Sequence, residues 1–180
     1  MPVPDFSPGE VLTAAAMDSI SGWLVKTQTV GTSVASVTVT GAFSADYQNY
    51  RVIYTGGVNS GDAGMNLTLG SSATGYYAGQ VLIAYSSGSL SAANSNNATS
   101  WGNVGIALTA GAFLDVELFR PFEALNTGLV VQSRTDMRTG GAASSGGGFH
   151  NVASSFSAFT ITSGAGTLTG GTIRVYGYRN

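Results

Sequence analysis

The segment that decides the fold is FLDVELF, residues 113–119, in which apolar and acidic residues alternate. Successive side chains of an extended strand point to opposite faces. The apolar residues inside this segment therefore share one face, and they are Leu114, Val116 and Leu118. Asp115 and Glu117 lie on the other face. The pattern predicts a half-buried antiparallel strand.

Nine further segments show strand-like patterns between clusters of Gly, Ser, Asn and Thr. All ten predicted strands are residues 23–30, 34–39, 50–55, 65–69, 77–85, 104–108, 113–119, 129–134, 156–161 and 172–178. Short strands at even spacing are typical of β-sandwiches and jelly rolls. We therefore expect an all-β protein whose residues 23–180 form a jelly-roll-like antiparallel β-sandwich.

Three segments rich in Gly, Ser, Asn and Thr are predicted to be loops. They are residues 86–100, 139–148 and 55–64. The first two are long for a compact domain, and loops of that length are usually functional or disordered. If the protein contacts a variable partner, we expect the contact at these loops.

Residues 1–22 carry the only helical signals in the chain. Three prolines before residue 9 impose extended backbone, and Thr13 then caps a short alanine-rich helix that ends at Gly22. A helix of this length is only marginally stable in water. We therefore expect residues 1–22 to pack against a neighbouring molecule or against the protein's own sheet. The apolar contacts would come from Phe6, Val11, Leu12, Met17, Ile20 and Trp23.

The composition argues against several classes of partner. Charged residues make up only 9% of the 180 residues, with seven basic and nine acidic side chains scattered along the chain. No electrostatic footprint for nucleic acid or an anionic membrane is present, and no apolar run is long enough for a membrane span. The chain has no cysteine, which excludes disulfides and thiolate metal sites. We expect no cofactor.

Catalytic residues are not predicted. Asp115 and Glu117 would emerge about 7 Å apart, a separation that glycosidases use, but the solvent side of an alternating strand explains them more simply. His150 is the only histidine. It follows a glycine-rich segment, and no activated serine or oxyanion element can be named beside it.

Aromatic residues offer two further hypotheses. The first group borders the 86–100 segment and consists of Tyr76, Tyr77, Tyr85 and Trp101. These residues either form a stacking platform for a sugar or anchor strand ends in the core. The second group consists of Phe113, Phe119 and Phe122. These side chains would form an apolar surface that a monomer should not expose. The second group predicts contacts between subunits of a closed threefold assembly.

Three segments carry a resemblance to a known group of proteins. FSPGEVLTAAAMDSI (residues 6–20), AFSADYQNYRVIYTGG (42–57) and GGTIRVYGYRN (170–180) resemble small virion proteins of tailed bacteriophages, namely minor tail proteins, tail-fibre modules and head decoration proteins. In that group the GEVLTAA part of the first segment commonly opens the chain or follows an attachment point. Ala16 and Asp18 replace the polar residue and the Asn of the usual LTAADMN form.

The resemblance implies a non-enzymatic structural protein on a virion, as a capsid decoration or minor tail protein attached through residues 1–22. Its expected partners are further copies of itself in a homotrimer and the major capsid or tail proteins. The alternative is a receptor- or carbohydrate-binding module of the tail, whose partner would be a host surface glycan.

Overall fold

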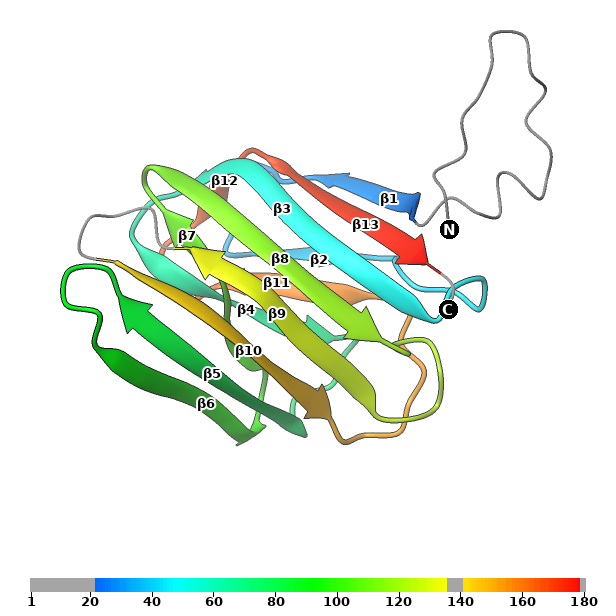
Figure 1. Ribbon diagram of the computed structural model, residues 1–180. Coiled ribbons are helices and arrows are strands. Elements are labelled where there is room, and N and C mark those ends of the chain that lie inside the picture. Colours follow the sequence, from blue (N-terminus) through cyan, green and yellow to red (C-terminus); the bar gives the residue numbers. More distant parts are fainter. Residues whose placement is uncertain (1–21, 136–140, 179–180) are drawn as a thin grey trace, which may run out of the picture.

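The structure is a computed structural model and describes residues 22–135 and 141–178. These residues form thirteen strands and no helix (Figure 1). The strands are β1 (Trp23–Thr29), β2 (Ser36–Val39), β3 (Asn49–Asn59), β4 (Ala63–Leu69), β5 (Tyr76–Ala84), β6 (Leu90–Ala98), β7 (Trp101–Leu108), β8 (Gly111–Phe119), β9 (Thr127–Thr135), β10 (Ala142–His150), β11 (Phe159–Ser163), β12 (Leu168–Thr169) and β13 (Thr172–Tyr178). Within the described residues, no helix is long and apolar enough to cross a membrane.

All pairings between these strands are antiparallel. The longest path of neighbours runs β2-β11-β4-β7-β8-β9-β10-β5-β6, and a branch from β8 continues through β3 and β13 to β1. In Figure 1 one group of strands lies in front, in the order β1, β13, β3, β8, β9, β10, β5 and β6. The strands β2, β11 and β4 lie behind them. The step from β7 to β8 connects the two groups.

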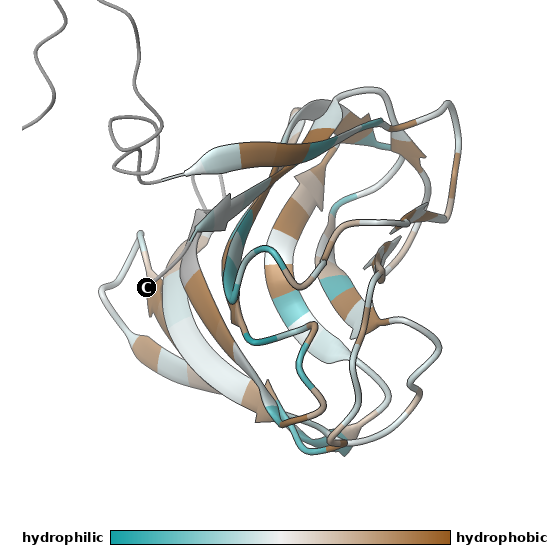
Figure 2. Ribbon diagram, turned by 90° about the vertical axis from the view of Figure 1, so that its right-hand side faces the viewer, coloured by the Kyte–Doolittle hydropathy of each residue, from teal (hydrophilic) through white to brown (hydrophobic). Residues whose placement is uncertain are grey.

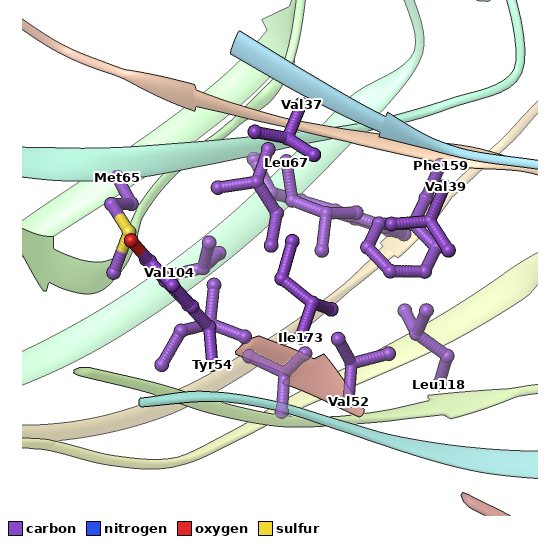
Figure 3. Close-up of a cluster of buried hydrophobic side chains, with 14 of the residues drawn as sticks. Val37, Val39, Val52, Tyr54, Met65, Leu67, Val104, Leu118, Phe159 and Ile173 are labelled. Atoms are coloured by element: carbon purple, nitrogen blue, oxygen red, sulfur yellow. The ribbon is translucent and has the colours of Figure 1, made fainter. Parts of the chain in front are cut away.

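The core lies between these two groups of strands. Val37, Leu67 and Phe159 approach it from β2, β4 and β11, and Val52, Leu118 and Ile173 approach it from β3, β8 and β13 (Figure 3). Figure 2 shows why these side chains enter the core, because apolar residues alternate with polar ones along several strands. Each fully buried aliphatic side chain of this kind contributes about 1.5–3 kcal/mol of transfer free energy.

The all-β antiparallel prediction is confirmed, since each of the ten predicted segments overlaps an observed strand. The loop predictions for residues 86–100 and 139–148 are wrong, because these segments contain β6 and β10. The predicted loop at 55–64 holds only a short turn between the ends of β3 and β4. Gly, Asn and Ala are weak strand formers, and here pairing with neighbouring strands overrides that preference. The predicted helix lies outside the described residues.

Candidate functional site

Two aromatic side chains stand side by side on the outer face of β5 and β10. Tyr77 and Phe149 are directly opposite each other in the β5–β10 register. Their ring centroids are 5.0 Å apart with only 8° between the planes, and Phe149 remains 43% exposed. Alternation along both strands produces this arrangement, because Tyr76 and His150, the adjacent residues, point into the core.

A groove opens beside the aromatic pair. It is open to solvent along much of its length and has a volume of about 460 Å³. Gly79 and Gly147 are the next outward register pair, and Asn94 of β6 lies opposite Gly79. The lining residues are Tyr77, Ala78, Gly79, Asn94, Ser95, Asn96, Gly147, Gly148 and Phe149. None of them is charged.

Gly79 keeps the groove open without serving the packing of the sheet. A Cβ atom built on Gly79 would meet no heavy atom within 4 Å. By contrast, a Cβ on Gly146 or Gly148 would come within 2.3 Å or 2.0 Å of a carbonyl oxygen of β5. Glycine inside a strand costs about 0.5–1 kcal/mol relative to alanine. Close packing explains the two inward glycines, whereas no neighbouring atom explains Gly79.

The β6 side of the groove is polar and neutral. Asn94 and Asn96 are exposed there. Each carboxamide presents two N–H donors and a carbonyl acceptor, the combination that matches neighbouring hydroxyl groups of a ligand. Ser95 contributes to the support of β6, because its Oγ accepts a hydrogen bond of 3.3 Å from the backbone N–H of Gly102.

Trp101 supports the aromatic pair from beneath. Its side chain is fully buried, and the indole Nε1–H donates to the carbonyl oxygens of Tyr77 at 3.2 Å and Phe149 at 3.4 Å. Tyr76 packs edge-on against the indole with 5.1 Å between ring centroids. The Tyr76 hydroxyl accepts from the N–H of Leu69 and donates to the carbonyl of Ser72. These contacts fix the backbone that carries the outward rings.

His150 belongs to the same inner layer and is fully buried. Its Nε2 lies 3.1 Å from the carbonyl oxygen of Thr74 and 2.8 Å from the Ser72 hydroxyl. Because a carbonyl only accepts, we assign the proton to Nε2. Burial lowers the pKa of His150, and the hydrogen bond to the backbone of Thr74 opposes this shift. The imidazole is therefore held neutral between aromatic rings.

The predicted sugar platform does not exist with its four predicted members. Tyr76 and Trp101 are fully buried and cannot present a ring face to a ligand. Tyr85 is exposed but lies beyond the end of β5 and does not line the groove. Tyr77 alone lies in the groove. The sequence analysis missed its partner Phe149. Phe149 and His150 repeat the arrangement of Tyr77 and Tyr76, with one residue pointing outward and its neighbour pointing inward.

Asp115 and Glu117 occupy the outer face of β8, as the alternation predicted, but Asp115 is more buried than a solvent-facing residue. The whole residue is only 8% exposed, and its carboxylate accepts from Arg51 Nε at 2.8 Å and Nη2 at 2.5 Å. Burial raises the pKa of Tyr178, and the charge of Glu117 raises it further. Asp115 is thus ion-paired with Arg51 across β8 and β3, while Glu117 lies beside Tyr178.

The remaining predicted contact residues are only partly described. Phe113, Phe119 and Phe122 are all half-buried, and Phe122 packs against the core. Phe113 and Phe119 lie six residues apart on β8, about 20 Å at the usual rise of a strand. Their role between subunits stays a prediction. Trp23 is half-buried at the start of β1, and the other five proposed attachment residues lie outside the described part of the chain.

Among the described residues no group of three His, Asp or Glu side chains is placed to hold a metal ion. No family model, curated protein or solved structure matches this chain. The groove is therefore interpreted from its own geometry.

Proposed function

We propose that this protein is a non-enzymatic glycan-binding module and that the groove on the outer face of β5, β6 and β10 is its binding site. The observation that carries the proposal is Gly79, a strand glycine whose missing side chain leaves space beside Tyr77 and Phe149. An aromatic wall, an open floor and neighbouring carboxamides are the features that recognise a sugar ring.

The ligand class follows from the lining. The C–H surface of a pyranose can pack against the aromatic side chains, while its hydroxyl or acetamido groups bond to Asn94 and Asn96. Among the described residues, no lysine or arginine lines the groove to pair with a carboxylate, sulfate or phosphate group. We therefore expect neutral saccharides to bind in preference to anionic ones.

Binding is tested with the purified full-length chain on an array of neutral and anionic oligosaccharides, followed by calorimetry with the best ligand. Gly79→Val fills the groove and should abolish measurable binding. Phe149→Ala should weaken affinity by about tenfold or more, the loss of one buried aromatic contact.

Gly61→Val is the matched control, because a Cβ on Gly61 also meets nothing within 4 Å and Gly61 lies outside the groove. It should bind as the wild type does. Equal affinity of the Gly79→Val and wild-type proteins, or no binding to any saccharide, would contradict the proposal.

We propose further that the protein is exposed on the virion of a tailed phage, as a capsid decoration or minor tail protein. Support comes from the three segments that resemble such proteins and from a surface with few charges. The finer fold prediction, a jelly-roll-like sandwich, belongs to the same proposal. A groove for sugars favours the tail station, where host surface glycans are met.

Attachment through residues 1–22 is tested by deleting them, since every described strand begins at Trp23 or later. The truncated protein should remain folded yet fail to sediment with particles that lack their own copy. Normal sedimentation would move the attachment surface to the β domain. Aggregation or unfolding would instead show that the segment covers the domain's own sheet.

A further inference from the structure

Four described strands pair with only one other strand: β1, β2, β6 and β12, of which β12 is also bridged by Val34 on its other side. An exposed edge strand presents unpaired backbone N–H and C=O groups, and proteins usually protect such edges. Three of the four show protection. β12 has two residues and β2 has four, while β1 carries Lys26 and a register irregularity between Leu24 and Lys26.

β6 lacks the charge and the shortness that protect the other edges, and its one register irregularity with β5 lies beyond Ser95, near the end of the strand. It is nine residues long, Leu90–Ala98, and its sequence LSAANSNNA contains no charged residue and no proline. Its register with β5 is regular from Leu90 to Ser95. In Figure 1 it forms the lower boundary of the front strands, opposite β1 at the top. A long, uncharged edge of this kind favours pairing with another strand.

The side chains beside this edge are apolar and exposed. Leu90 is 70% exposed, and its register partner Ile83 is 47% exposed. Val81, opposite Ala92, is 55% exposed. A strand edge alone is narrow, so these side chains supply the apolar area that a stable contact between proteins needs. They lie next to the edge, at the β5–β6 hairpin end, and away from the aromatic end of the groove.

We propose that β6 is the contact between two copies of this chain, with the two β6 strands antiparallel about a twofold axis and the sheets continuous across it. A second copy fits because the contact is self-complementary: each β6 presents the same unpaired edge and the same apolar row. The absence of charge on β6 means that the two copies meet no like-charge repulsion. The outward groove stays open in this arrangement.

Sedimentation velocity of the full-length protein over a range of micromolar concentrations tests the contact. Ala92→Lys places a charge beside the axis in both copies, and it should halve the mass of the assembly. Thr29→Lys is the matched control, because Thr29 is exposed on the edge strand β1. It should leave the mass unchanged. Denaturant unfolding confirms that both variants are folded.

Crosslinking gives a second measurement, helped by the absence of native cysteine. Ala92→Cys should form a disulfide-linked dimer under mild oxidation, because the two Ala92 residues face each other across the axis, whereas Thr29→Cys should form no disulfide-linked species. A wild-type monomer at every concentration overturns the proposal. So does an assembly whose mass is the same in wild type and Ala92→Lys, because another surface must then hold the copies together.

Discussion

Tyr76 and Tyr77 are neighbours on β5, and His150 and Phe149 are their register partners on β10, yet the two pairs meet different surroundings. The inward pair is fully buried against Trp101, and the Tyr76 hydroxyl and His150 Nε2 bond to backbone and side-chain groups. The outward pair stacks at the edge of an open groove. Aromatic residues one position apart thus serve folding on one face and are available for binding on the other.

The largest expected effect is on the inner face. Trp101→Ala removes a buried indole together with its hydrogen bonds to the carbonyls of Tyr77 and Phe149. We expect the free energy of unfolding to fall by about 3–5 kcal/mol. Urea denaturation measures it. A loss below 1 kcal/mol would show that the indole does not hold the two strands in place.

Acidification tests the inner face in a second way. The pKa of His150 is lowered in the folded protein, mainly by burial. The unfolded chain therefore binds the proton at higher pH, near the ordinary value of about 6.5, and stability should fall as pH drops below that value. The loss ends once pH is below the folded pKa, where both states are protonated.

Denaturation at closely spaced pH values between 7.5 and 5 measures this loss. His150→Phe keeps an aromatic ring without a titrating group and should flatten the pH dependence over this interval. An unchanged slope in that variant would assign the effect to other groups.

The sequence predicts the fold well where apolar and polar residues alternate, as in β4 and β8. It fails at β6 and β10, because their Gly, Ser, Asn and Ala residues carry no strand signal of their own. β6 becomes a strand by pairing with β5 in a hairpin, and β10 by pairing with β5 over a long sequence distance. The groove is lined by these same three strands, so its location could not be predicted from local patterns.

The aromatic hypothesis shows the same limit at single residues. YY at 76–77 indicates that one ring points inward and one outward, but not which. The register with β10 and the position of Trp101 decide it. Gly79 is the one indication of the groove in the sequence, because a glycine interrupts a predicted strand there and no turn follows it.

The outer face should tolerate truncation. Phe149→Ala removes a ring that is 43% exposed, so we expect a loss of about 1 kcal/mol or less in unfolding free energy. Comparison with Trp101→Ala under the same conditions sharpens the contrast between faces. A loss as large as that of Trp101→Ala would mean that the stacked pair is structural and would weaken the case for a binding role.

The ion pair on the outer face of β3 and β8 should have a modest, salt-dependent effect. The Arg51 side chain is 46% exposed and that of Asp115 is 12% exposed. We expect Arg51→Met to cost about 0.5–1 kcal/mol at low salt and less at high salt. Denaturation at two ionic strengths measures the difference. Glycan binding should not change, because neither residue lines the groove.

The smallest expected effect has the opposite sign and separates binding from folding at one residue. Gly79→Ala adds a methyl group where no atom lies within 4 Å, and it restricts the unfolded chain. We expect the free energy of unfolding to rise by about 0.5–1 kcal/mol, while affinity for the saccharide falls as the methyl group enters the groove. Gly148→Ala is the contrast on the inner face, because its Cβ would lie 2.0 Å from the Tyr77 carbonyl oxygen, and it should destabilise the protein. Thermal unfolding and calorimetry on the same samples measure both quantities. A Gly79→Ala protein that is less stable than wild type would show that the sheet itself requires this glycine, and the groove would lose its main support.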